Sequence, residues 1–275
     1  MSGNGAAGKG TAVVTGASSG IGRIYAERLA ARGYDLVIVA RNAERLEALA
    51  ATIRSATGRS VDVLQADLEK PADIRRVADR VAGDRAVTLL VNNAGAGTEG
   101  PVLGTDIDRV EAMVQLNVVA LTRLAVTAVN AFSARGGGTL VNIASVVALM
   151  PEVLLGAYAG TKAFVLAFTQ SLQNELQGSP VRIQAVLPGL TRTEFFDRAG
   201  LALDSYPQEM VMSVEELVDA ALAGLDQGEL ITIPSLPDAG DFARVSADRL
   251  ALVPNLSRNH PAERYRQWVG AVGWR

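Results

Sequence analysis

The sequence predicts an α/β fold, in which a doubly wound parallel sheet of seven strands carries helices on both faces. Short apolar runs alternate with helical stretches along the chain, and no linker separates them. The second, fourth and sixth runs are nearly continuous in Val, Ile and Leu, as expected of parallel strands covered on both faces. A glycine-rich turn directly follows the first run and precedes a helical pattern, which is typical of a βαβ unit.

The individual elements follow from this alternation. We expect strands over 11–15, 35–40, 61–66, 87–91, 139–144, 181–187 and 229–233. We expect helices over 21–32, 42–56, 71–82, 105–133, 156–177 and 213–226. Asn42 and Thr105 have the residue types that begin helices. Residues 11–275 are therefore expected to form one domain, preceded by a glycine-rich, disordered N-terminus over 1–10 that does not resemble a signal peptide.

Composition argues against several classes of function. The net charge of −3 and the isoelectric point of 5.4 provide no basic surface for nucleic acid. The chain has no cysteine, which excludes disulfides and thiolate chemistry and fits a cytoplasmic protein. Its single histidine, His260, is expected at the surface, so neither a metal site nor serine-hydrolase chemistry is expected. We expect no apolar run to approach the roughly 18 residues that a membrane span needs, and therefore no membrane association.

The glycine-rich turn is the first candidate binding site. It runs from Thr15 to Gly22 with glycines at 16, 20 and 22, after the first strand and before a helix. Glycines at such a turn let the backbone approach a pyrophosphate, which the N–H groups at the helix N-terminus can bind. Without this context the same pattern could be an ordinary tight loop.

Two further motifs close predicted strands. Asn92-Asn93-Ala94-Gly95 follows the strand over 87–91, and Pro188-Gly189-Leu190-Thr191-Arg192-Thr193 follows the strand over 181–187. Ligands bind at the C-terminal ends of strands in open α/β sheets, so both segments are candidate parts of one site. Each motif alone could simply mark an ordinary turn or loop, but their order relative to the glycine turn favours a common function.

A serine, a tyrosine and a lysine form the candidate catalytic group. Ser145 precedes Tyr158 by thirteen residues, and Lys162 follows Tyr158 by four, which places the last two on one helix face. A phenol with a pKa near ~10 is a poor base, and a neighbouring ammonium would favour the phenolate. Ser145 would hydrogen-bond the oxygen that gains or loses the proton, an arrangement suited to reversible carbonyl reduction. The alternative is an amphipathic helix with a buried tyrosine and a surface lysine.

With these motifs in this order, the chain resembles the short-chain dehydrogenase/reductase family over about residues 10–235. The resemblance implies a Rossmann-type fold and hydride transfer between a nicotinamide and a carbonyl or secondary alcohol. It implies Ser145, Tyr158 and Lys162 as catalytic residues. It adds Asn117, from Leu116-Asn117-Val118, as the anchor of a water that relays protons to the lysine.

The resemblance also implies the residues that contact the cofactor. Asp67 would contact the adenine amino group, Asn93 and Gly95 would support the adenosine ribose, and Lys162 would bind the nicotinamide ribose. Pro188, Gly189 and Thr193 would hold the carboxamide. The full implied set is Gly16, Ser18, Ser19, Gly20, Ile21, Gly22, Arg41, Asn42, Asp67, Leu68, Asn93, Ala94, Gly95, Tyr158, Lys162, Pro188, Gly189, Thr191 and Thr193.

The end of the second predicted strand favours NADP over NAD. An enzyme that uses NAD usually places a carboxylate there, and this chain has Ala40. Arg41 follows, and its guanidinium can hold a 2′-phosphate through paired hydrogen bonds. Ser18 and the backbone N–H of Asn42 could add further bonds. The alternative makes Arg41 a solvated residue before a helix.

The expected substrate is a predominantly apolar ketone, aldehyde or secondary alcohol. The resemblance implies that two segments line its site, the second of them as a lid over about 190–212. No basic residue adjoins the catalytic serine, which disfavours a charged substrate there, and Arg192 and Arg198 are read as solvated lid charges. The apolar residues expected to line the site are Val146, Val147, Leu149, Met150, Pro151, Val153, Leu154, Phe195, Phe196 and 201–203.

Other functions and assemblies stay open at this point. A 3-oxoacyl thioester reductase and a non-catalytic dinucleotide-sensing regulator could use the same fold, although the complete catalytic group favours an enzyme. Epimerase and dehydratase relatives fit less well, because they use a different glycine spacing and a longer C-terminal substrate domain. Only about forty residues follow the last strand here. The helices over 105–133 and 156–177 are apolar around most of their circumference, which predicts a homodimer or homotetramer. The C-terminal extension over about 237–275 could cover these faces instead.

Overall fold

The structure is a computed structural model of the whole chain and describes residues 9–97, 103–152, 156–195 and 202–265. The chain divides into two compact units, Met1–Ser235 and Leu236–Arg275. The first unit contains all seven strands, and the second contains helices α9 (Ala239–Ala251) and α10 (Val253–Leu256). An extension was predicted from about residue 237, but no helices within it. His260 is exposed, as predicted.

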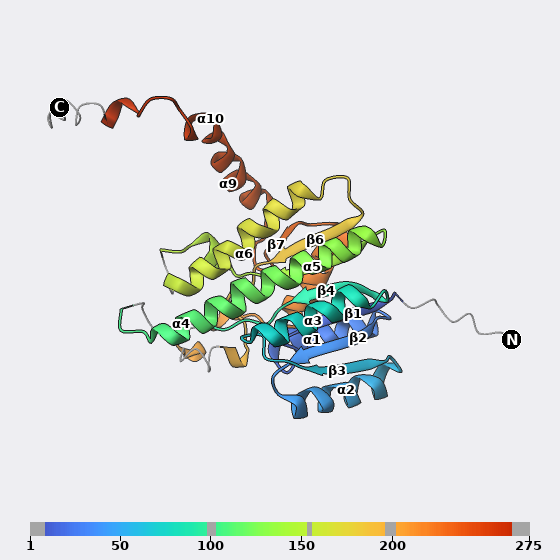
Figure 1. Cartoon of the computed structure of the whole chain (residues 1–275). Helices are drawn as coiled ribbons and strands as arrows, with labels where there is room; N and C mark the ends of the chain where they lie inside the picture. The colour runs from blue at the N-terminus through green and yellow to red at the C-terminus, as the bar shows by residue number, and fades with distance from the viewer. Residues whose placement is uncertain (1–8, 98–102, 153–155, 196–201, 266–275) are drawn as a thin grey trace. The chain divides into compact units, whose positions relative to one another are not determined.

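A parallel sheet of seven strands organises the first unit, which confirms the predicted fold class (Figure 1). The strand order is β3-β2-β1-β4-β5-β6-β7. The order reverses between β1 and β4, and ligands bind in open α/β sheets at such a reversal. The bounds are β1 Thr11–Thr15, β2 Asp35–Ala40, β3 Val61–Gln65, β4 Val87–Asn92, β5 Gly138–Ile143, β6 Val181–Val186 and β7 Ile231–Thr232.

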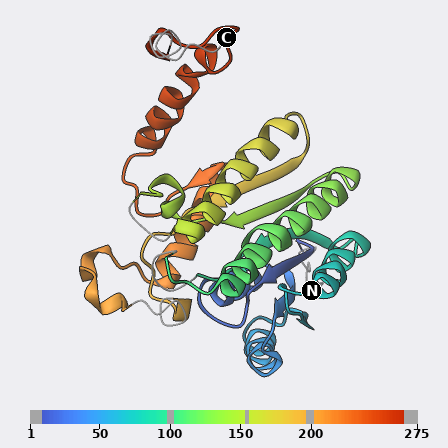
Figure 2. The same cartoon turned by 60° about the vertical axis from the view of Figure 1, so that its left-hand side comes forward.

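Helices cover both faces because successive strand side chains point to opposite sides. Ala12 and Val14 of β1 pack with helices α1 (Gly20–Ala31), α2 (Ala43–Thr57) and α8 (Val214–Gln227). Val13 packs on the opposite face, with α3 (Pro71–Gly83), α5 (Leu121–Ala134) and part of α6 (Gly156–Glu175). Both views show α5 and α6 running side by side over this second face (Figure 2).

Two elements differ from the sequence prediction. The helix expected over 105–133 consists of α4 (Ile107–Val114), a π-helical turn over Gln115–Ala120, and α5. Hydrophobic periodicity does not distinguish a π turn from an α turn in a helix of this length. The last strand contains only Ile231 and Thr232, rather than 229–233, because only these residues pair with β6.

The joined helix over Ile107–Ala134 corrects the expectation about apolar runs. It has 28 residues and a mean hydropathy of 1.6 over its most apolar window, so by length and composition it could cross a membrane. Its inner face includes Leu124, Ala128 and Phe132, each fully buried against the sheet. The core helix of a soluble protein satisfies the same criteria, and packing on the sheet accounts for the apolar character of this face.

Candidate active site

The glycine turn between β1 and α1 is closely packed against the loop after β4. Gly16 and Gly20 have φ angles of +67° and +53°, in the left-handed region that favours glycine. A Cβ on Gly16 would lie 2.7 Å from the side-chain nitrogen of Asn93, and one on Gly22 would lie 2.4 Å from the carbonyl oxygen of Gly16. Glycine is therefore required at these positions for the turn to pack, and the turn leads into the N-terminus of α1, where backbone N–H groups can bind a phosphate.

Thr15 fixes this turn to the loop after β4. Its hydroxyl donates to the carbonyl oxygen of Val91 at 3.2 Å and accepts from the N–H groups of Asn93 and Ala94 at 3.0 and 3.1 Å. The Asn93 side chain donates in return to the carbonyl oxygen of Thr15 at 2.9 Å. Thr15 was not predicted to have this role, although its place at the end of the first strand indicates it.

The three candidate catalytic residues line one cavity of about 830 Å³. Ser145 follows β5, where its hydroxyl donates to the carbonyl oxygen of Pro188 and accepts from the N–H of Val147, both at 3.3 Å. Tyr158 and Lys162 lie one turn apart on α6, and their exposed fractions are 8% and 5%. Lys162 is therefore not the surface residue of the alternative interpretation.

Burial opposes ionisation of both groups. It raises the pKa of Tyr158 above its ordinary value, while a hydrogen bond with Ser145 acts in the opposite direction. Burial lowers the pKa of Lys162 to about 8, and its ammonium donates to the carbonyl oxygen of Ile143 at 2.9 Å. Desolvation of the phenol outweighs the hydrogen bond with Ser145, and the predicted effect of Lys162 on the phenol stays a prediction.

Asn117 lies behind the cavity wall, in the π turn. It is 1% exposed, and its side chain forms two hydrogen bonds with Ala96, accepting from the N–H and donating to the carbonyl oxygen, each at 2.9 Å. It also donates to the Thr161 hydroxyl at 3.0 Å. These bonds join the loop after β4 to α6, and π turns are frequent at functional sites. The proposed anchoring of a water stays a prediction.

Most of the implied cofactor residues meet at the same cavity. Gly22 lies behind the turn and is not among the lining residues. The others that line it are Gly16, Ser18, Ser19, Gly20, Ile21, Arg41, Asn42, Asp67, Leu68, Asn93, Ala94, Gly95, Pro188, Gly189, Thr191 and Thr193. Among the described residues, no group of three His, Cys, Asp or Glu side chains could hold a metal ion.

A model of the short chain dehydrogenase family matches residues 10–202 of the sequence. The chain belongs to the short-chain dehydrogenase/reductase family. The match includes the glycine turn and all of the candidate catalytic residues, and it ends before α8.

Solved structures of short-chain dehydrogenases resemble the chain over most of its length. A short-chain dehydrogenase from Sphingobium yanoikuyae in complex with NADPH is 46% identical, with a TM-score of 0.91 over 94% of this chain and 100% of that one. The bulky-bulky ketone specific alcohol dehydrogenase from Comamonas testosteroni is 42% identical, with a TM-score of 0.86 over 93% of this chain and 98% of that one.

Curated members of the family are more distant. Human 17-beta-hydroxysteroid dehydrogenase type 3 is 35% identical over 64% of this chain and 57% of its own length. The very-long-chain 3-oxoacyl-CoA reductase of Podospora anserina is 34% identical over 80% of this chain and 65% of its own length. The matched region is thus less than two thirds of the length of these relatives.

Several residues that line the cavity were not predicted from the sequence. Arg109, Ala112, Met113 and Leu116 form one face of the α4 and π-turn helix, and all four line the cavity. Their spacing of three and four residues was a usable signal. Arg45, Glu69, Glu194 and Tyr206 also line it, although no local pattern predicts this.

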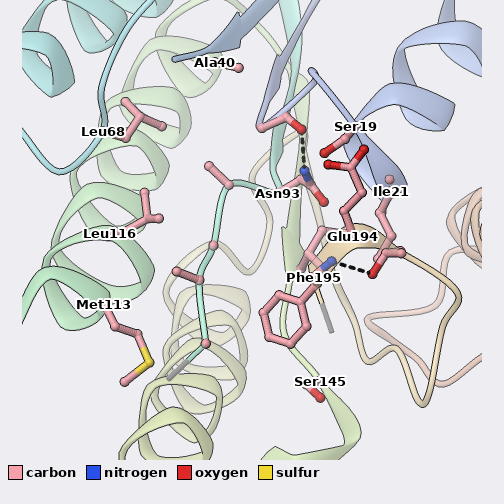
Figure 3. Close-up of a pocket in the computed structure, with 18 of the residues that line it drawn as sticks. Ser19, Ile21, Ala40, Leu68, Asn93, Met113, Leu116, Ser145, Glu194 and Phe195 are labelled. Atoms are coloured by element: carbon pink, nitrogen blue, oxygen red, sulfur yellow. Dashed lines mark hydrogen bonds between the residues drawn. The ribbon is translucent and has the colours of Figure 1, made fainter. Parts of the chain in front are cut away.

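The wall around Tyr158 is apolar. Met113, Val147 and Ala159 pack with Tyr158, and the Phe195 ring lies 5.4 Å from the tyrosine ring. Figure 3 shows Met113 and Phe195 at the pocket. Val147 and Phe195 were predicted to line the substrate site. Leu149 and Met150 are about two-fifths exposed and do not line the cavity. Val153, Leu154, Phe196, Leu201 and Arg198 lie outside the described residues. Arg192 contacts Gln208 and Asp204, as expected of a solvated charge.

Proposed function

We propose that the chain is an NADP-dependent carbonyl reductase or alcohol dehydrogenase that acts on bulky, predominantly apolar ketones and the corresponding secondary alcohols. The meeting of Ser145, Tyr158 and Lys162 in the cavity that the glycine turn also lines carries this proposal. A hydroxyl, a phenol and an amine in one buried site can polarise a carbonyl and manage its proton.

The residues at the end of β2 fit NADP. Ala40 leaves this strand end without a carboxylate that would repel a 2′-phosphate, and Arg41 lies beside it in the cavity. The closely packed glycine turn leads into the N-terminus of α1, where backbone N–H groups can bind the pyrophosphate. When bound, the nicotinamide supplies or accepts the hydride. The NADPH complex of the Sphingobium yanoikuyae enzyme supports this choice of cofactor.

The protein's own residues would handle the proton. Burial keeps the Tyr158 phenol protonated at neutral pH, so it can donate a proton to the oxygen of a ketone during reduction. Ser145 would hydrogen-bond the same oxygen and stabilise the developing alkoxide. Lys162 and Asn117 would return the proton to Tyr158 from solvent.

The apolar wall formed by Met113, Val147 and Phe195 supports the substrate class, because such side chains bind apolar groups without leaving polar atoms unpaired. A cavity of about 830 Å³ has to hold both cofactor and substrate. The bulky ketones named for the Comamonas testosteroni enzyme are consistent with this wall.

The test is the oxidation of NADPH by purified protein in the presence of ketones that carry two bulky apolar groups. We expect turnover with these ketones and at least about tenfold lower kcat/KM for ketones that carry a carboxylate. Turnover confined to anionic ketones would contradict the proposed substrate class. Absence of turnover, with NADPH still bound, would favour the regulator hypothesis.

A 3-oxoacyl thioester reductase is the second candidate. The similarity to very-long-chain 3-oxoacyl-CoA reductases favours it, and Arg109 in the cavity wall offers a cation for an anionic carrier. The net charge of −3 does not favour the binding of an acidic carrier protein. Activity on 3-oxoacyl-CoA that exceeds activity on neutral bulky ketones would decide for this candidate.

A further inference from the structure

An ion pair between Arg45 and Glu194 joins two distant segments at the cavity. One guanidinium nitrogen of Arg45 donates to both carboxylate oxygens of Glu194, at 3.1 and 2.8 Å. Arg45 is in the first turn of α2, directly after β2, and Glu194 follows Thr193 in the segment after β6. Both side chains line the cavity, so the pair lies within the proposed cofactor site.

The surroundings of the two residues place the pair across this site. In the sheet, β1, β4 and β5 separate β2 from β6. A Cβ on Gly20 would lie 3.3 Å from the Thr193 side chain, so the segment before Glu194 passes beside the glycine turn. The Glu194 carboxylate lies beside Ser19 and Ile21 (Figure 3). Arg45 therefore reaches from the proposed 2′-phosphate end toward the proposed pyrophosphate end.

Arg41 has a similar partner. It lies at the end of β2 and forms a 3.1 Å ion pair with Glu69, which also lines the cavity. The Arg41 side chain is 64% exposed and the Arg45 side chain is 49% exposed. Ion pairs as exposed as these are weak, and a phosphate dianion is a stronger partner for a guanidinium than a solvated carboxylate.

We propose that Arg45 is a second ligand for the 2′-phosphate of NADP, beside Arg41, and that Glu194 competes with this phosphate for Arg45. The inference rests on the proposed use of NADP. It makes Arg45 and Glu194 determinants of cofactor specificity, with opposite effects. Arg45 strengthens the binding of a 2′-phosphate, and Glu194 weakens it by holding the same guanidinium.

The experiment measures nucleotide binding without turnover. Calorimetric titration with adenosine 2′,5′-bisphosphate and adenosine 5′-monophosphate gives the affinity ratio that the 2′-phosphate contributes. We expect this ratio to fall about threefold to tenfold in Arg45→Met and to rise up to about fivefold in Glu194→Gln. Glu194→Gln should have no effect on the ratio in the Arg45→Met background, because the guanidinium for which Glu194 competes is then absent.

A matched control separates this competition from general charge effects. Glu27→Gln removes a carboxylate from the 2.9 Å Arg23–Glu27 ion pair, whose residues do not line the cavity, and should leave the ratio unchanged. An unchanged ratio in Arg45→Met would overturn the inference. Equal tightening of both nucleotides by Glu194→Gln would also overturn it, because the carboxylate would then act on a phosphate that both share. A wild-type ratio near one would instead overturn the proposed NADP preference.

Discussion

The ammonium of Lys162 lies 5.7 Å from the centre of the Tyr158 ring and donates its hydrogen bond to the carbonyl oxygen of Ile143. The two residues are one helical turn apart, and both are buried. Burial raises the pKa of the phenol and lowers that of the lysine, so it favours the neutral form of each. The phenol is therefore protonated at neutral pH, in the form that reduction of a ketone requires.

Replacing Tyr158 with phenylalanine should reduce kcat at least about hundredfold, because the proton donor is lost. The affinity for NADPH, measured by fluorescence titration, should change less than about twofold, since the ring itself remains. Ser145→Ala should reduce kcat by a similar order while leaving the fold intact. A Tyr158→Phe protein with near wild-type kcat would rule out the proposed catalytic role.

Lys162 should make stability depend on pH in the alkaline range. Its pKa is lowered from 10.5 to about 8 in the folded protein, so between these values the unfolded chain binds more protons. The free energy of unfolding of the wild type, relative to Lys162→Met, should therefore rise from about pH 8 to pH 10.5. Denaturant titrations of both proteins at several pH values measure this difference, because the buried tyrosines contribute equally to both. A flat or falling difference would contradict the burial of the charge.

Gly22 should tolerate no side chain. A Cβ there would lie 2.4 Å from the carbonyl oxygen of Gly16 and 2.5 Å from the Asn93 side chain. Gly22→Ala should lower the free energy of unfolding by about 1–3 kcal/mol and weaken NADPH binding, because the turn must shift. Gly83→Ala is the matched control, since nothing lies within 4 Å of its added Cβ. Equal stability of the two variants would show that the turn is not tightly packed.

Arg41 and Ala40 should set the cofactor preference. We expect kcat/KM for NADPH to exceed that for NADH by at least about tenfold, or roughly 1.4 kcal/mol. Arg41→Ala combined with Ala40→Asp should invert the preference, because it removes a phosphate ligand and adds a repelling carboxylate. Steady-state kinetics with both cofactors test this, and equal efficiency in the wild type would contradict it.

The outer faces of α5 and α6 should form a contact between subunits. Val119 and Val126 are 44% and 40% exposed on the π turn and α5, and Phe164 of α6 is 37% exposed. Light scattering at micromolar concentration should give a dimer or tetramer, and Val126→Glu should weaken it. Ala82→Glu, at an exposed position of α3, is the control. A monomeric wild type would refute the prediction.

The sequence by itself determined the order along the chain of the seven strands and of the long helices between them, and most of the residues that line the cavity. Apolar runs must be buried and alternate with amphipathic helices, so their spacing determines the α/β class. Motifs at successive strand ends meet at one edge of a parallel sheet. For this reason Gly16, Asn93, Ser145 and Gly189 could be placed at one site from their positions along the chain.

Tertiary structure alone decided the electrostatics and the long-range pairs. The pKa values of Tyr158 and Lys162 depend on how much water burial removes, which spacing does not reveal. The π turn around Asn117 has a sequence that also fits an α-helix. Arg45 and Glu194 are 149 residues apart, and they meet only because the segment after β6 passes beside the glycine turn. Interactions between distant segments depend on the packing of whole elements, and local sequence patterns do not specify that packing.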